Sequence, residues 1–204
     1  MNTVAEKKPK ELGRPRAFNK EEALDKALML FWQKGYEGTS LADLTEALAI
    51  NKPSLYAAFG NKEDLFRQAM LRYQAGPVAY IKEAFKAPTA RQAVEMFLNQ
   101  SADLLTNPEN PRGCLAVQGA LSCSDGAHAI KQELIQLRKN TEGALCRRLQ
   151  GAQQDGDFPQ TVNAADFARY IATVHQGLSV QAATGANRAQ MQSVIDFLLN
   201  NWPS

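Results

Sequence analysis

Residues 51–59, which read NKPSLYAAF, place polar side chains where they could contact a nucleic acid. In a helix of this sequence, Leu55 and Phe59 lie four positions apart and share one face, which we expect to be buried. A lysine ammonium and hydroxyl groups on the opposite face can bind phosphates and base edges. The side chains predicted to point outward are Lys52, Ser54 and Tyr56. A helix this short needs neighbouring helices to hold it, and its outer face suits insertion into a DNA groove.

Cap and turn residues divide the surrounding chain into four short helices. Asn19 is followed three positions later by Glu22, a spacing typical of a capping box, and Gly35 is expected to end the first helix. Ala49 and Ile50 predict a tight turn between the second and third helices. The predicted N-caps are Asn19, Thr39 or Ser40, Asn51 and Asn61. Residues 19–75 are therefore predicted to form a compact helical unit.

The rest of the chain keeps a helical pattern, and nothing in it is typical of a strand. The predicted helices lie near 77–86, 89–106, 112–122, 125–152, 163–183 and 188–201. The sequence therefore predicts an all-α fold.

Composition and charge narrow the class of protein. Of the 204 residues, 45% are hydrophobic, which is enough to form a core. There is no long apolar run and no apolar signal-peptide region, and the three cysteines suit a reducing compartment, so we expect a cytoplasmic protein without membrane contact. Residues 1–20 carry six basic and two acidic side chains, whereas 76–204 carry 11 of each. The positive charge lies beside the predicted DNA-contacting helix, although a solvated tail is an alternative interpretation.

The segment from Gly35 to Phe66 resembles the tetracycline-repressor (TetR) family. It contains a glycine after the first helix, Thr39-Ser40 at the start of the second, Leu55-Tyr56-Ala57-Ala58-Phe59 in the third and Lys62-Glu63-Asp64-Leu65 at the start of the fourth. The resemblance implies an N-terminal three-helix helix-turn-helix DNA-binding domain and a larger helical domain for ligand binding and dimerisation. The domains implied are a flexible basic arm at 1–18, a DNA-binding domain at 19–75 and an effector-binding and dimerisation domain at 76–204.

Nine residues are predicted to contact DNA. Third-helix residues would meet the major groove, Lys62 and the second-helix cap would clamp phosphates, and the arm would enter the minor groove. The predicted DNA-contacting residues are Arg14, Arg16, Thr39, Ser40, Asn51, Lys52, Ser54, Tyr56 and Lys62. Thr39 could instead act only as a helix cap, and Lys62 could be a solvated lysine. Ala57 and Ala58 stand where relatives carry larger residues, so direct base readout is expected to be sparse.

The C-terminal half is expected to hold a small-molecule effector, and position alone suggests residues for its pocket. They are Phe97, Cys114, Gln118, Tyr170 and His175. Cys114 would open a helix beside Arg112, which would favour its thiolate and permit oxidant sensing; a small buried hydrophobic role is the alternative. Cys114, Cys123 and His128 have poor spacing for zinc, so neither a metal nor a cofactor is expected.

Two apolar stripes near the C-terminus predict a four-helix bundle across a two-fold axis. The predicted dimer-interface residues are Phe167, Ile171, Val174, Leu178, Val194 and Leu198. The alternative is that both stripes face only the core of a single protomer.

The leading hypothesis is a ligand-responsive transcriptional regulator, with a repressor favoured. It would bind a palindromic double-stranded DNA operator as a homodimer and be released by a small-molecule effector. One alternative is a helical ligand-binding or scaffold protein with a weakened DNA-binding helix, and another is a thiol-based regulator that senses oxidants or electrophiles. An enzyme is disfavoured, because the sequence contains no G-x-S-x-G, P-loop, H-E-x-x-H or G-x-G-x-x-G motif.

Overall fold

The computed structural model describes residues 19–122 and 125–204, and within these ranges every regular element is a helix. The prediction of an all-α fold is therefore confirmed. The elements, in chain order, are α1 (Lys20–Gly38), α2 (Leu41–Leu48), α3 (Lys52–Phe59), α4 (Lys62–Ala75), α5 (Tyr80–Ala84), α6 (Ala90–Thr106), α7 (Leu115–Ser122), the 3₁₀ turn η1 (Asp125–Ala127), α8 (His128–Gln154), α9 (Ala164–Ala183) and α10 (Arg188–Asn200).

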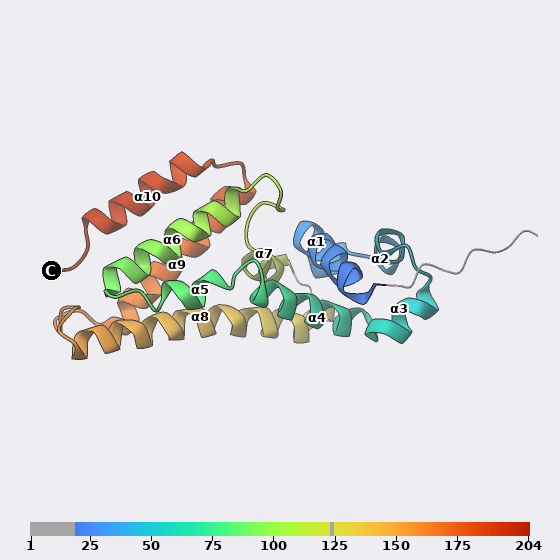
Figure 1. Cartoon of the computed structure of the whole chain (residues 1–204), viewed down its shortest axis with the longest axis horizontal. Helices are drawn as coiled ribbons and strands as arrows, with labels where there is room; N and C mark the ends of the chain where they lie inside the picture. The colour runs from blue at the N-terminus through green and yellow to red at the C-terminus, as the bar shows by residue number, and fades with distance from the viewer. Residues whose placement is uncertain (1–18, 123–124) are drawn as a thin grey trace, which may run out of the picture.

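The molecule is elongated, with α1–α3 at one end and α10 and the C-terminus at the other (Figure 1). α4 leads from the end that carries α3 towards the middle of the molecule, and the long α8 runs along the lower side of the view in Figure 1. α7 lies between the two halves, close to α1. Within the described residues, no helix is both long and apolar enough to cross a membrane.

The first four helices begin at the residues that the sequence indicated. Asn19, Asn51 and Asn61 cap α1, α3 and α4 through their side-chain oxygens. Ser40, rather than Thr39, caps α2 and forms a capping box with Asp43. The backbone of Gly35 leaves the helical region with φ 73° and ψ 174°, so the regular part of α1 ends there and one further short turn follows.

Three predicted helices have different bounds in the structure. The helix expected at 77–86 is only α5, because residues 76–79 form turns after α4. The helix expected at 112–122 begins later, at Leu115, because Gly113 has φ +84°. The helix expected at 125–152 starts with the 3₁₀ turn η1 and continues as α8 to Gln154.

Aromatic side chains join the N-terminal helices to the rest of the core. The rings of Phe31 and Phe66 meet edge to face with centroids 5.0 Å apart, and those of Trp32 and Tyr73 do so at 4.9 Å. All four side chains are buried. Because α1 and α4 share this aromatic packing, a displacement of α4 is resisted by α1.

Candidate functional site: a DNA-contacting helix and an internal cavity

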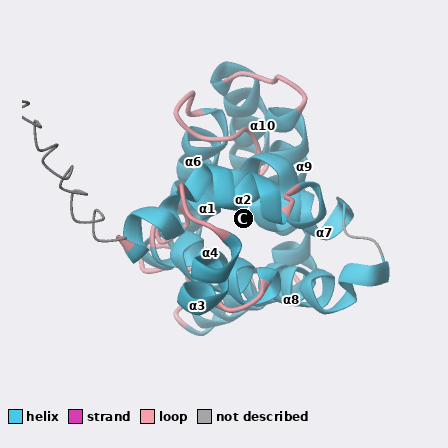
Figure 2. Ribbon diagram, turned by 90° about the vertical axis from the view of Figure 1, so that its right-hand side faces the viewer, coloured by secondary structure: helices cyan, strands magenta, loops and turns pink. Residues whose placement is uncertain are grey.

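α3 presents the outward face that the sequence predicted. Leu55 and Phe59 are buried. Asn51, Lys52, Ser54 and Tyr56 are exposed, and the exposed fraction of Tyr56 is 47%. Figure 2 views the molecule from the end where α2 and α3 lie in front. The polar face of α3 is thus open to solvent, and Leu55 and Phe59 pack into the core on the opposite face of the helix.

The N-terminus of α3 is suited to binding an anion. The Asn51 side chain accepts from the Ser54 N–H at 2.9 Å, and Pro53 occupies the first turn, where no N–H is needed. No acidic residue lies in the first turn of α3, so the positive end of the helix dipole is not neutralised there.

Two further predicted contacts lie near the starts of neighbouring helices. Ser40 is exposed, and its hydroxyl both donates to the Asp43 carboxylate and accepts from the Asp43 N–H. The hydrogen bond from Lys34 holds the pKa of Asp43 below its usual range, with the bonds from Ser40 adding to the effect. Lys62 places its ammonium 4.3 Å from the centre of the Tyr36 ring. Burial lowers the pKa of Lys62, against the opposing effect of Glu37 and Asp43.

Thr39 has a buried side chain, unlike the other described residues that are predicted to contact DNA. Thr39 is fully buried, and its hydroxyl donates to the Gly35 carbonyl at 2.7 Å. This geometry favours the alternative interpretation of Thr39 as a cap, because the hydroxyl is inside the fold and closes the end of α1. Arg14 and Arg16 lie outside the described residues.

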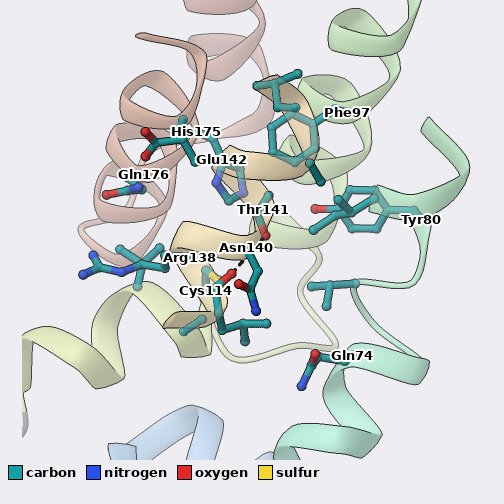
Figure 3. A pocket seen from close by; sticks show the side chains of 18 of the residues that line it. Gln74, Tyr80, Phe97, Cys114, Arg138, Asn140, Thr141, Glu142, His175 and Gln176 are labelled. Atoms are coloured by element: carbon teal, nitrogen blue, oxygen red, sulfur yellow. Dashed lines mark hydrogen bonds between the residues drawn. The ribbon is translucent and has the colours of Figure 1, made fainter. Parts of the chain in front are cut away.

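A cavity of about 230 Å³ lies between α4–α9 in the other half of the molecule. Most of its wall is apolar, from residues such as Ile81, Phe85, Phe97, Val117 and Leu145. Tyr80, Cys114, Thr141 and His175 are among its polar residues, and the wall also contains Gln74, Lys82, Arg138, Asn140, Glu142 and Gln176. Figure 3 shows His175, Tyr80 and Thr141 pointing towards one common space, whereas Arg138 and Gln176 extend away from it. This arrangement of apolar walls and a few convergent polar groups is typical of a small-molecule site.

The structure brings together three of the five predicted pocket residues. Phe97, Cys114 and His175 line the cavity, and the rings of Phe97 and His175 lie 4.8 Å apart. Gln118 and Tyr170 do not line this cavity. Gln118 donates to the Arg112 carbonyl at 3.3 Å, outside the cavity wall, and Tyr170 is 45% exposed on α9 because its helical position faces outward. Tyr80 was not predicted as a cavity residue, since the short helix after a turn gives no periodic pattern that would place its side chain.

Burial controls the ionisation of the two main polar groups in the cavity. Burial lowers the pKa of His175 to about 4, so the imidazole is neutral at physiological pH. Burial also raises the pKa of Tyr80, although the hydrogen bond with Ser101 opposes the effect. The deep part of the cavity therefore carries no formal charge.

The segment Gly113–Cys114 connects the cavity with α1, α4 and α9. The Gly113 carbonyl accepts from Trp32 Nε1 at 2.8 Å. Cys114 accepts from the Tyr73 hydroxyl at 3.5 Å through Sγ, and its N–H donates to Ser179 Oγ at 2.8 Å. A ligand that displaces Cys114 would therefore act directly on the helices that carry α3.

The outer face of α9 and α10 differs from the predicted dimer interface. Ile171, Leu178 and Leu198 are buried within the protomer, which leaves little of their side chains for contact with a partner. The alternative that these stripes form an intramolecular core fits these residues. Phe167 and Val174 are partly buried and pack against the core, and only Val194 of the predicted set is exposed. Val180 and Phe197, which the stripe pattern missed, are also exposed.

Comparisons with known proteins agree with this architecture. Residues 23–69 match the model of the bacterial regulatory proteins of the tetR family, and residues 90–198 match the tetracyclin repressor-like C-terminal domain. The chain is 32% identical over 200 residues to the HTH-type transcriptional repressor ComR of Escherichia coli K12, covering 95% of this chain and 93% of ComR. It is 33% identical over 193 residues to the repressor BdcR of the same strain, covering 92% and 91%.

One solved structure is similar to this chain in both fold and sequence. It is a cysteine mutant of the TetR family transcriptional regulator CifR complexed with 26-bp double-strand operator DNA. The TM-score is 0.89 at 40% identity, and the match covers 94% of this chain and all of that one. Both halves of the chain are included in this match, so the chain belongs to the TetR family of transcriptional regulators.

Proposed function

We propose that this chain is a ligand-responsive repressor that binds a palindromic operator as a homodimer in the cytoplasm. In this proposal α3 enters the major groove, and a small molecule in the cavity releases the protein from DNA. The observation that carries the proposal is the exposed face of α3, with Lys52, Ser54 and Tyr56 outward and both apolar anchors inward. The structure of CifR on operator DNA and the repressor names of ComR and BdcR favour the same role.

The proposal assigns different tasks to the polar residues of the DNA-binding end. Lys52, Ser54 and Tyr56 are the residues best placed to meet the groove and its phosphates, with Asn51 and Ser40 at the helix starts. Lys62 would contact a flanking phosphate. Its ammonium would either move away from the Tyr36 ring or contact the ring and the phosphate together. The predicted domain division at residues 18 and 75, including the basic arm with Arg14 and Arg16, remains part of the proposal.

Dimerisation is proposed through the exposed face of α9 and α10. Val180 on α9 and Val194 and Phe197 on α10 are exposed, and Phe197 is 70% exposed. Large apolar side chains exposed on a protein surface favour a protein partner. A two-fold axis through this face would pair α9 and α10 with their copies, which is the geometry that a palindromic operator requires.

The experiment is a fluorescence-anisotropy titration with a labelled operator, taken first from DNA flanking the gene and otherwise selected from random sequences. We expect Lys52→Ala to weaken binding about tenfold or more and to make its salt dependence less steep. Lys86→Ala is the matched control, since Lys86 is exposed in the other half of the molecule. If no selected DNA binds in a salt-dependent way, the scaffold alternative replaces the repressor.

A thiol sensor is a second candidate, favoured by the position of Cys114 in the cavity wall beside Tyr73. Peroxide would oxidise the thiol to a sulfenic acid with release of water. In this case peroxide should release the wild-type protein from its operator, and Cys114→Ser should not respond. Cys146→Ser serves as control because Cys146 is partly exposed and does not line the cavity. An equal response in all three proteins would exclude the candidate.

A further inference from the structure

The hydroxyl groups near the cavity donate their protons in hydrogen bonds to other atoms of the protein. Ser101 donates to the Phe97 carbonyl at 2.6 Å, so in its 2.8 Å contact with Tyr80 the tyrosine is the donor. The Thr141 hydroxyl donates to the Leu137 carbonyl at 3.3 Å. Each of these oxygens therefore offers only lone pairs to a molecule in the cavity.

His175 is the polar group that faces Tyr80 and Thr141 across the cavity (Figure 3). Among the residues whose side chains the structure describes, no hydrogen bond to its ring is present, and the ring points into the cavity beside Phe97 (Figure 3). A neutral imidazole presents one donor and one acceptor. Together with Tyr80 and Thr141, the cavity thus offers a surplus of acceptors.

The charged residues of the cavity wall do not add free hydrogen-bond donors beside Tyr80, Thr141 and His175. Lys82 is exposed at the rim, and Glu142 is engaged by Arg169 at 3.3 Å. Arg138 extends away from the common space, although its Nε has no hydrogen-bond partner within the described structure. Gln74 donates to the Met70 carbonyl and Asn140 is exposed. Beside Tyr80 and Thr141, a carboxylate would therefore meet only the N–H of His175 and several lone pairs, which is unfavourable for an anion. An ammonium group would lose its hydration there without gaining a free carboxylate as partner, because Glu142 is already paired with Arg169.

We propose that the cavity takes an uncharged molecule with an apolar body and a hydroxyl group that donates to Tyr80 or Thr141 and accepts from His175. This inference rests on the proposed function, because it assigns the chemical class of the effector. The space is sufficient, since an apolar cavity of about 150 Å³ accepts benzene and this one measures about 230 Å³. The rings of Phe85 and Phe97, with centroids 5.4 Å apart, suit an aromatic body.

The test uses four probes with the same carbon skeleton: 1-phenylethanol, acetophenone, phenylacetate and 1-phenylethylammonium. Their Kd values for the full chain are measured by isothermal titration calorimetry at pH 7.5. We expect the alcohol to bind about threefold to tenfold more tightly than the ketone, which lacks the donor, and the two ions to bind weakest. Tighter binding of either ion, equal binding of alcohol and ketone, or no binding of any probe would overturn the inference.

Variants test which oxygen accepts the ligand proton. Tyr80→Phe or Thr141→Val should reduce the preference for the alcohol over the ketone at least threefold, and the inference fails if neither does. Tyr170→Phe is the matched control, since it removes an exposed hydroxyl outside the cavity and should leave the preference unchanged. Operator binding without ligand is measured for every variant, so a wrong effector class is distinguished from a failure of the repressor function itself.

Discussion

Trp32 Nε1 on α1 donates a hydrogen bond of 2.8 Å to the carbonyl of Gly113, the residue that precedes the cavity residue Cys114. The bond joins residues 81 positions apart and is buried. It connects the helix that supports the DNA-binding end with the segment that a ligand would touch. A buried bond of this kind fixes the relative position of the two parts, because breaking it leaves a carbonyl without a partner.

Trp32→Phe is expected to lower the free energy of unfolding by about 1–3 kcal/mol, since it leaves the buried Gly113 carbonyl unpaired. It should also reduce the effect of a cavity ligand on operator affinity while leaving ligand binding intact. Chemical denaturation and anisotropy titrations with and without ligand measure the two effects. Trp202→Phe is the control, since Trp202 packs against Phe158 and Phe167 at the opposite end of the molecule. If the ligand has the same effect on operator affinity in Trp32→Phe as in the wild type, the Trp32–Gly113 hydrogen bond does not couple the cavity to the DNA-binding end.

Gly113→Ala should be strongly destabilising, by about 3 kcal/mol, because a Cβ at φ +84° is strained and would lie 1.9 Å from Gln118 Nε2 and 3.1 Å from the Ser179 carbonyl. Adding Gln118→Ala should restore only part of the loss, since the backbone strain and the Ser179 contact remain. Gly151→Ala is the control. That glycine lies in α8 with nothing within 4 Å of an added Cβ, so the change should be neutral or stabilising by up to about 1 kcal/mol. Thermal and urea unfolding report all three.

Phe197→Asp should dissociate the proposed dimer without unfolding the protomer, because the side chain is 70% exposed in the single chain. Sedimentation equilibrium should give a monomer, and operator affinity should fall because two linked half-sites are no longer bound together. Leu71→Asp is the matched control, since Leu71 is 66% exposed on α4 and lies outside the α9–α10 face. A dimer that persists in Phe197→Asp would place the interface elsewhere.

His175 should make stability depend on pH in a specific window. Its pKa is about 4 in the folded protein, against an ordinary value of 6.5. Between these values the unfolded chain binds a proton that the folded chain does not, so the free energy of unfolding falls as the pH is lowered. The loss is about 1.6 kcal/mol between pH 6.5 and 5.0.

Urea unfolding at pH 7.5 and 5.0 tests this dependence by comparing variants. His175→Phe should be less sensitive to pH than the wild type, whereas His128→Phe should not differ from it, since His128 is exposed. Equal pH dependence in wild type and His175→Phe would show that the imidazole is not kept neutral by the fold.

Sequence patterns located the helices well where a cap and an apolar period coincided. Asn51 with Pro53, and Leu55 with Phe59, defined α3 and the orientation of its faces without any knowledge of the remainder. The family resemblance of residues 35–66 and the regulatory, non-enzymatic class that it implied are confirmed by the comparisons. These features depend on local backbone preferences, so they can be read from neighbouring residues.

The cavity and the dimer face depend on contacts between distant segments, and there the sequence was less informative. The stripe containing Ile171 and Leu198 was the most apolar face of its helices, and for that reason it forms the core of the protomer. The outward face is mixed, with Thr173 and Gly177 between the exposed apolar residues, and gives no clear periodic signal. Tyr80 and Trp32 reach their partners through tertiary packing alone.

α3 has two buried side chains, Leu55 and Phe59, and the Phe59 carbonyl also accepts from Gln68 Nε2 at 2.9 Å. Its stability and its recognition surface are therefore set by different residues. The outer positions, Lys52, Ser54, Tyr56 and Ala57, could be exchanged for those of another regulator with little effect on folding. We expect such an exchange to change the operator preference of this scaffold and to leave the proposed response to the ligand intact.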